Sequence, residues 1–401
     1  MSFKQFLLPL IIILIVALSF LLATTDWYKN LIKKEQISIQ QSTSREKINE
    51  QKRGQNKTLI FLEKPNKIHL IEVDDNGQKI STERFDISAE INEVRQIVGN
   101  RLYFFDKEGL IRYVDLKNKQ VNKINFVIKD WGHWPYGGKN FLISPDNKKL
   151  FWTVTKYKNL TEKEKQKLEK GETLWPADIK YPERWYVEMW MADLENQNIK
   201  LLFQKDLTVG EYILPLKFSS FQKEIYFLET ITGLGGYTPF RCPPGILYKV
   251  NLEDGKINKL VGEDEKEYYI GFCNFSSDGK LIVYSLSHNL IIKNLVTKEK
   301  VVIPVDKKFA YFGNAFFSPD NKFLVYSSAF GDPDNEKYTI TLVNLSTLEK
   351  KEVLNGLYFL RGWLDEKNLV VQNLDGNVYL INKDHVGLRK ISNFDFIGII
   401  E

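Results

Sequence analysis

The sequence contains little cysteine and little histidine, and this scarcity excludes several classes of protein. Only two cysteines, Cys242 and Cys273, occur in 401 residues, so neither a disulfide framework nor a cysteine zinc cluster can form. The pair could bridge if the chain reaches an oxidising compartment, or remain two buried thiols. The four histidines are far apart and show no metal-ligand spacing. We therefore expect no metal site and no cofactor.

Motifs of common enzyme classes are also missing. The chain has no Gly-x-Ser-x-Gly elbow for serine hydrolysis and no glycine-rich phosphate loop between a strand and a helix. Ser276–Gly279 approaches a sialidase-type turn, but there the glycine directly follows the aspartate. The acidic loop Gly331–Glu336 lacks the full spacing of a calcium loop. These absences predict a non-enzymatic protein without catalytic residues.

The charge balance is nearly even. The 56 basic and 51 acidic residues give a net charge of +5, and this mild, dispersed excess does not favour nucleic acid binding. With 43% hydrophobic and 13% aromatic residues, the chain can build a large core.

One long apolar run is present, Phe6–Ala23, without a single charge. As a helix it would extend about 27 Å, close to the thickness of a bilayer core. A cleaved signal peptide is the alternative, but its apolar region would be shorter, about 7–15 residues, and would end in a small-residue cleavage site. We predict a signal-anchor transmembrane segment at 1–25. Lysines on its C-terminal side nominally favour a cytoplasmic C-terminus, yet long domains translocate largely regardless of charge, so the sidedness stays open.

Residues 26–57 read as a polar stalk. They are rich in Gln, Lys, Asn, Ser and Glu, and their few apolar residues cannot form a core.

From residue 58 the chain repeats a pattern of short β-branched and aromatic strands separated by polar turns. Three segments are nearly identical: Phe141–Leu150, Phe275–Leu281 and Phe317–Leu324. Each predicts a strand, a tight Ser-x-Asp turn and a second strand. Once the insertions Lys156–Glu183 and Thr230–Gly245 are set aside, the period is about 44 residues, which is that of a four-stranded propeller blade.

A second mark gives the number of blades. This mark is an Asp or Asn at the end of each predicted third strand. The pattern occurs seven times, at Asp74, Asp115, Asp193, Asn251, Asn294, Asn344 and Asn382. We therefore predict an all-β, seven-bladed β-propeller of four-stranded blades over 58–401. Blade 1 lacks an inner strand, so the tail Phe394–Ile400 is expected to supply it and close the ring. A tail strand that frays is the alternative.

The Phe-Ser-Pro-Asp-[Gly/Asn]-Lys turn resembles the repeat of TolB-like propellers, which are WD-repeat-like and also occur in prolyl-oligopeptidase-type enzymes. The resemblance covers residues 58–401. It implies a scaffold and no particular activity, because fold alone does not fix function. In the peptidases a separate hydrolase domain carries the nucleophile, and no residues remain here to build one. The resemblance favours an exocytoplasmic propeller.

The long insertions join second to third strands and therefore share one face with the links between blades. Aromatic residues and an arginine are concentrated there, and such residues are enriched in binding hot spots. They could equally pin the loops down as a small satellite core. The candidate binding residues are Trp131, Trp134, Tyr136, Trp175, Trp185, Tyr237 and Arg241.

These patterns predict a membrane-anchored propeller that binds a protein partner in the cell envelope. The alternative is an enzyme, or a carbohydrate-binding or carbohydrate-processing protein, with its site on the loop-rich face. The ligand, the pathway and the oligomeric state cannot be read from the sequence.

Overall fold

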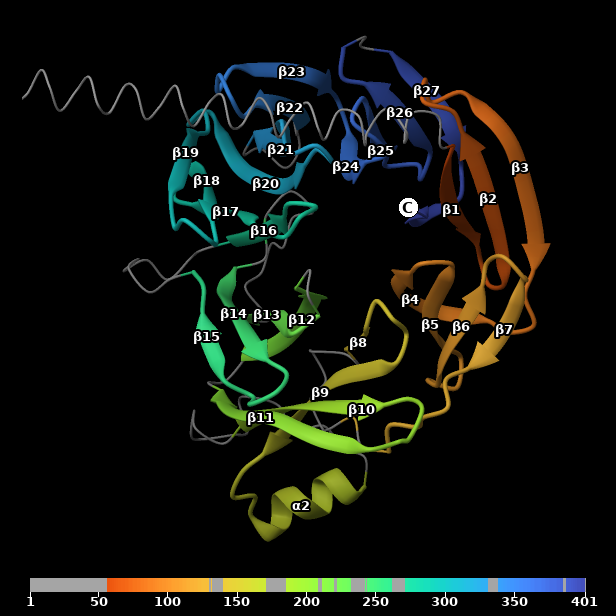
Figure 1. The fold of residues 1–401 in the computed structure, drawn as a ribbon, viewed down its shortest axis with the longest axis vertical. Coiled ribbons are helices and arrows are strands. Elements are labelled where there is room, and N and C mark those ends of the chain that lie inside the picture. Colours follow the sequence, from red (N-terminus) through yellow and green to blue (C-terminus); the bar gives the residue numbers. More distant parts are fainter. Residues whose placement is uncertain are drawn as a thin grey trace, which may run out of the picture. The chain divides into compact units, whose positions relative to one another are not determined.

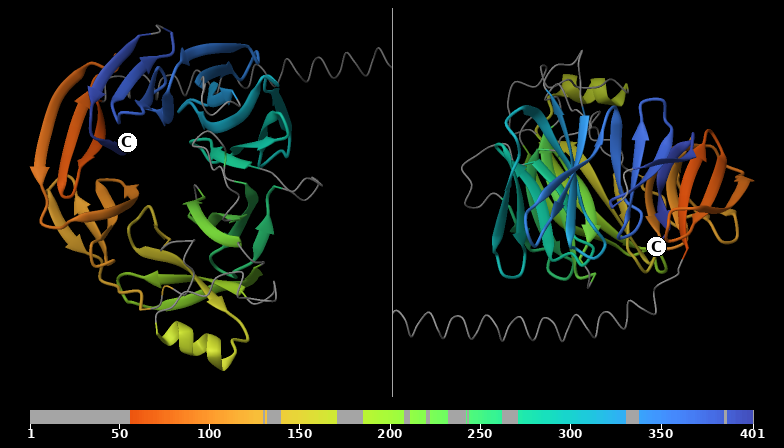
Figure 2. Two further views of the ribbon diagram at one scale, coloured as in Figure 1. Left: turned by 180° about the vertical axis from the view of Figure 1, so that it is seen from behind. Right: turned by 90° about the horizontal axis from the view of Figure 1, so that it is seen from above.

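The computed structural model describes residues 56–129, 131, 140–170, 185–207, 211–219, 222–231, 242, 244–261, 271–330, 338–384 and 387–400. In these ranges the chain forms seven antiparallel sheets of four strands each, which stand side by side in a ring (Figure 1; Figure 2). The predicted all-β, seven-bladed propeller is confirmed. No helix in these ranges is long and apolar enough to span a membrane, and the predicted span at 6–23 lies outside them.

The strands of each blade follow one order from the axis outwards. For blades 1 to 7, the inner strands are β28 (Asp395–Ile400), β4 (Ile91–Val98), β8 (Phe141–Ile143), β12 (Glu211–Phe218), β16 (Gly271–Phe275), β20 (Phe309–Phe317) and β24 (Tyr358–Trp363). The second strands are β1 (Lys57–Glu63), β5 (Arg101–Asp106), β9 (Lys149–Tyr157), β13 (Glu224–Ile231), β17 (Leu281–Leu286), β21 (Phe323–Phe330) and β25 (Asn368–Asn373).

The two outer positions complete each sheet. The third strands are β2 (Lys67–Val73), β6 (Ile111–Asp115), β10 (Trp185–Asp193), β14 (Gly245–Asn251), β18 (Asn289–Asn294), β22 (Tyr338–Asn344) and β26 (Val378–Asn382). The outermost strands are β3 (Lys79–Asp86), β7 (Gln120–Lys123), β11 (Ile199–Leu207), β15 (Ile257–Lys259), β19 (Lys300–Pro304), β23 (Lys350–Asn355) and β27 (Leu388–Ser392).

The second strands are apolar on both faces, because every blade has a neighbour on each side. In β1, Leu59 and Phe61 pack into the cluster shared with blade 7, whereas Ile60 and Leu62 pack into the cluster shared with blade 2. This is the two-residue side-chain period of a strand, with each set of alternate residues buried on a different side. Seven apolar clusters fill the seven interfaces between successive blades. The outermost strands are mostly exposed, as in β3.

The seven Asp and Asn marks have a common structural reason. Each lies at the end of a third strand, where its side-chain oxygen accepts hydrogen bonds from backbone N–H groups of the following turn. Asp193 Oδ1, for example, accepts bonds from the N–H groups of Glu195 (2.9 Å) and Asn196 (3.1 Å). These bonds satisfy backbone N–H groups that have no partner in a neighbouring strand, because the chain turns there towards the outermost strand.

The C-terminal strand closes the ring. β28 pairs with β1 in antiparallel register from Thr58↔Ile400 to Leu62↔Asp395, so one sheet contains both ends of the described chain. Phe396 lies edge-to-face on Phe61 with ring centroids 5.8 Å apart. The predicted closure is confirmed.

The insertions are fastened at their ends. In the first, α2 (Glu162–Glu169) begins with a capping box, in which the Thr161 and Glu164 side chains each accept the other's backbone N–H. In the second, Cys242 and Cys273 form a disulfide with their Cα atoms 4.6 Å apart. Since Cys273 lies on β16, the disulfide ties the end of this insertion to an inner strand.

Deletion of residues 394–401 should strongly destabilise the propeller. It removes the only strand pairing the inner edge of β1 and the half-buried side chains of Phe394, Phe396 and Ile399. Full burial of such a side chain contributes about 1.5–3 kcal/mol, so three half-buried ones contribute several kcal/mol, a large share of the stability of a typical domain, about 5–15 kcal/mol. Thermal denaturation of the deletion variant measures this. The control is Leu388→Ala, at a side chain 42% exposed. An unchanged melting temperature in the deletion variant would exclude closure by β28.

Reduction of the disulfide should lower the melting temperature of the oxidised protein. Cys242 and Cys273 are 31 residues apart, and closing a loop of that size in the unfolded chain corresponds to about 3–4 kcal/mol. Denaturation with and without reductant, compared with the Cys242→Ala, Cys273→Ala double variant, checks this. The double variant should not respond to reductant. If reductant changed the melting temperature of the wild type no more than that of the double variant, the cysteines of the wild type would be free.

Candidate functional site

The structure describes two of the seven candidate binding residues. Trp185 is 2% exposed and packs against Tyr157, with ring centroids 4.3 Å apart, in the core between blades 3 and 4. Trp131 is half-buried and packs edge-to-face on Phe105 at 5.5 Å. Both therefore pack against the propeller, as in the satellite-core alternative. The other five candidates, Trp134, Tyr136, Trp175, Tyr237 and Arg241, lie outside the described residues, and their role as a binding surface stays a prediction.

A groove on the flank of the propeller was not predicted. It lies between blades 2 and 3 and exists because their strands differ in length: β9, β10 and β11 have nine residues each, whereas β6 has five and β7 has four. Blade 2 therefore cannot cover the whole facing surface of blade 3. The segment Ile124–Lys129, which links the two blades, crosses the uncovered part, with Ile124 and Ile128 buried and Val127 63% exposed.

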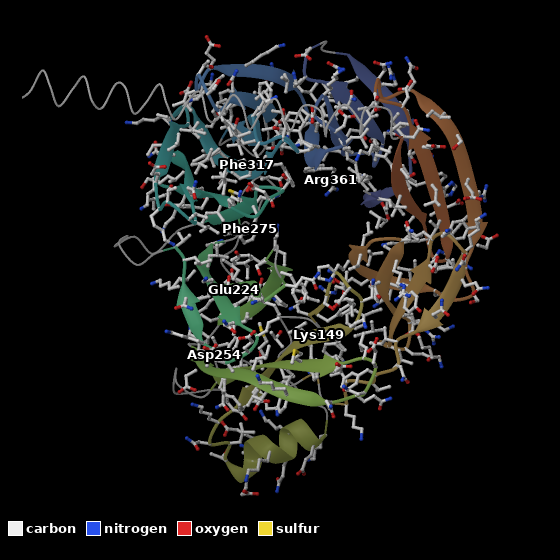
Figure 3. The ribbon with its side chains drawn as sticks, in the orientation of Figure 1. Lys149, Glu224, Asp254, Phe275, Phe317 and Arg361 are labelled. Carbon is white, nitrogen blue, oxygen red and sulfur yellow. A yellow bond between two sulfur atoms is a disulfide. The ribbon has the colours of Figure 1, made fainter. Side chains whose placement is uncertain are left out.

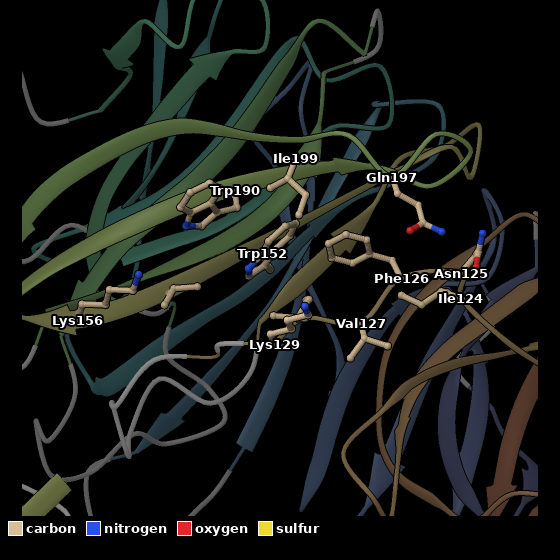
Figure 4. A pocket seen from close by; sticks show the side chains of 12 residues that line it. Ile124, Asn125, Phe126, Val127, Lys129, Trp152, Lys156, Trp190, Gln197 and Ile199 are labelled. Carbon is tan, nitrogen blue, oxygen red and sulfur yellow. The ribbon is translucent and has the colours of Figure 1, made fainter. Parts of the chain in front are cut away.

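The flank groove has a volume of about 630 Å³ (Figure 4). Its lining consists of Ile124, Asn125, Phe126, Val127, Ile128, Lys129, Trp152, Val154, Lys156, Trp190, Gln197 and Ile199.

Strand register builds the aromatic wall of the groove. Trp152 on β9 pairs directly with Trp190 on β10, so both indoles project from the same face of blade 3. Their ring centroids are 6.4 Å apart and their planes differ by 16°, so the two indoles are stacked and nearly parallel. Phe126 from the link segment lies against Trp152 at 5.4 Å. Exposure increases outwards, from Trp152 at 5% through the half-buried Trp190 to Leu201 at 38%.

Polar groups stand at one end of the wall. The Glu188 carboxylate, on a residue 7% exposed, accepts a hydrogen bond from Trp190 Nε1 (2.9 Å) and lies 3.0 Å from Lys156 Nζ. This fixes the Trp190 ring and neutralises the buried carboxylate. Lys129, Asn125 and Gln197 add donors and acceptors on the rim.

Other reactive groups in the described residues serve the fold. His69 lies 2.9 Å from Glu63 and stacks on Phe394 at 4.2 Å, and His288 stacks on Phe312 at 6.1 Å. Burial raises the pKa of Tyr157 to about 12, so its hydroxyl stays protonated near neutral pH. No cluster of three His, Cys, Asp or Glu side chains in the described part of the chain could hold a metal. The acidic loop Gly331–Glu336 lies outside that part.

No protein-family model matches the sequence, and no curated protein does. Solved structures do match. Prolyl endopeptidases align with a TM-score of 0.51 and 10% identity over 85% of this chain and 50% of theirs. An oligogalacturonate lyase in complex with manganese aligns with a TM-score of 0.49 and 14% identity over 85% of this chain and 86% of its own. A protein described as TolB from Agrobacterium tumefaciens aligns with a TM-score of 0.39 and 12% identity over 75% and 89%, respectively.

These similarities correct one prediction. The expectation of a non-enzymatic chain is wrong as an inference from this fold, because prolyl endopeptidases share the propeller. The missing sequence motifs exclude particular chemistries and not catalysis in general. At 10% identity the likeness establishes the fold alone, so the activity has to be argued from this chain's own site.

Proposed function

We propose that this protein binds, and in that way takes part in processing, a saccharide, with the flank groove as its site. The observation that carries the proposal is the cross-strand pair of Trp152 and Trp190, two stacked, nearly parallel indoles, the outer of which is half-buried, in a groove of about 630 Å³. Small-molecule sites in proteins are typically about 300–1,000 Å³ and combine an apolar wall with a few placed polar groups.

The chemistry of the groove suits a sugar ring. One face of a pyranose carries C–H groups and packs on an aromatic plane, while its hydroxyls point sideways and need hydrogen-bond partners. The half-buried Trp190 ring offers the plane, and Lys129, Asn125 and Gln197 on the rim offer the partners. The bond from Trp190 Nε1 to Glu188 holds the outer ring in place before a ligand arrives, which limits the entropy lost on binding.

Catalysis in the groove would rest on few groups. The described residues that line it include no carboxylate, and Glu188, which contacts Lys156 and Trp190, is a single one, whereas hydrolysis by a pair of acids requires two. Binding is therefore the part of the proposal that the groove supports directly.

Trp190→Ala should weaken saccharide binding about tenfold or more, since truncation of an aromatic hot spot costs on the order of 2 kcal/mol. Trp190→Phe should retain part of the affinity because it keeps a ring against Trp152.

Screening neutral and acidic oligosaccharides by calorimetry, with product analysis of the same mixtures, measures both binding and processing. The control is Tyr379→Ala, at a half-buried aromatic residue of blade 7. Equal affinities for wild type, control and Trp190→Ala would refute the groove as the site. Binding of apolar peptides in place of sugars would refute the ligand class.

We also propose that the propeller is anchored by residues 6–23 and lies outside the cytoplasm. The disulfide between Cys242 and Cys273 supports this, because disulfides persist in oxidising compartments. The protein should stay with membranes at alkaline pH, and protease added to intact cells or spheroplasts should reach the propeller. Before reductant is added, thiol-reactive maleimide should not label the protein. Release at alkaline pH would refute the anchor, and labelling without reductant would refute the location.

A further inference from the structure

The inner strands share an irregularity. Their pairing with the second strands is interrupted in six blades by extra, unpaired residues, and a bulge of this kind redirects side chains. The unpaired residues are Ile397, Asn92, Arg95, Leu216, Cys273, Ala310, Asn314 with Ala315, and Arg361. Only two of them, Arg95 and Arg361, are charged.

The bulge in β24 gives Arg361 its direction. It falls between Leu360, paired with Val371, and Gly362, paired with Val370. Gly362 has a φ of 130°, a conformation that side-chain-bearing residues rarely adopt, so the glycine is needed for this backbone path. Arg361 is solvent-exposed and points towards the centre of the ring in Figure 3.

A buried amide holds the guanidinium in place. Gln372 on β25 is 6% exposed, and its Oε1 accepts bonds from Arg361 Nε (2.9 Å) and Nη2 (2.5 Å). The Gln372 Nε2 donates in turn to the Gly376 carbonyl at 3.0 Å, which fixes the orientation of the amide. Phe359 lies beside the guanidinium, 5.9 Å from its carbon to the ring centroid. The edge of the guanidinium formed by Nε and Nη2 is thus bound to Gln372. The N–H groups on the edge formed by Nη1 and Nη2 can still donate to a ligand.

The charge of Arg361 lacks a paired carboxylate among the described residues, as do those of Arg101 and Arg389, in contrast to two arginines of blade 2. Arg112 pairs with Asp106 and Arg95 with Glu93. Although the Arg361 side chain is exposed, partial desolvation of its guanidinium lowers the pKa of Arg361. The charge of Asp395 partly opposes this shift, and Asp395 itself lies 3.9 Å from Lys64. A cation that is oriented by a neutral amide and only weakly compensated is poorly suited to stabilising a fold and well suited to receiving an anion.

We propose that Arg361 is the anchor of an anion site on the propeller axis and binds a carboxylate through Nη1 and Nη2. The planar fork of a guanidinium matches the two oxygens of a carboxylate, and Gln372 positions that fork without neutralising it. This site is separate from the flank groove, which lies between blades 2 and 3, whereas Arg361 belongs to blade 7. The carboxylate could belong to a uronic acid or to the C-terminus of a peptide.

Matched charged and neutral probes test the site in the full-length protein. Glucuronate is compared with glucose, and a short acetylated peptide ending in a free carboxylate is compared with its amide. Calorimetry and NMR should detect binding of at least one carboxylate probe and of neither neutral partner. Arg361→Gln should weaken that binding about tenfold or more, as expected for a charge-assisted bidentate contact. Arg361→Lys should recover part of it, and Gln372→Met should weaken it without removing the charge.

Two further measurements separate a ligand site from a structural arginine. Arg389→Gln, at an exposed arginine that donates to the Asn76 carbonyl, is the matched control and should bind like wild type. Without ligand, Arg361→Gln should melt only slightly lower than wild type, because the bonds to Gln372 Oε1 are lost but no ion pair is. A lower melting temperature with unchanged carboxylate affinity would overturn the proposal, and so would the absence of carboxylate-dependent binding to wild type. Binding of glucuronate alone would identify a sugar acid as the source, and binding of the peptide alone a chain terminus.

Discussion

Every sheet in this protein has two apolar faces, and the remaining architecture follows from the need to cover both. A single four-stranded sheet with Leu59 and Phe61 on one side and Ile60 and Leu62 on the other cannot be stable in water. Stacking such sheets side by side buries one apolar face after another, but the first and the last sheet of an open stack each keep one apolar face exposed. A ring removes the ends. The seven apolar clusters, the radial order of strands and the exposure of the outermost strands are consequences of this one requirement.

The same requirement explains where ligand sites can arise. Neighbouring blades cover each other only where their strands have equal length and regular pairing. The nine-residue strands of blade 3 exceed the short outer strands of blade 2, and the excess surface becomes a groove with an aromatic wall. Near the axis, the bulge in β24 departs from regular pairing and releases Arg361 from the packed interface. Both candidate sites are thus local departures from a repeat that otherwise leaves little open surface.

The repeat could be predicted from the sequence because its signals are local. Asp193 and the six equivalent residues end strands by capping their own turns, so their chemistry is visible without knowledge of the fold. Closure by the tail followed from counting strands. The wall of Trp152 and Trp190 could not be predicted, since a 28-residue insertion separates them and strand register alone brings them together. The direction of Arg361 depends on a bulge, and a lone glycine after an arginine gives no sign of one.

The pairing of β28 with β1 also sets an order in time. During synthesis the second, third and outermost strands of blade 1 are made before its inner strand, so the inner edge of β1 has no partner until residues 395–400 leave the ribosome. While the six blades between β1 and β28 are made, this apolar strand therefore presents open backbone donors and acceptors, the kind of edge that pairs with other chains and aggregates. The ring closes only once β28 is available. The strand β28 therefore decides when the edge of β1 is protected.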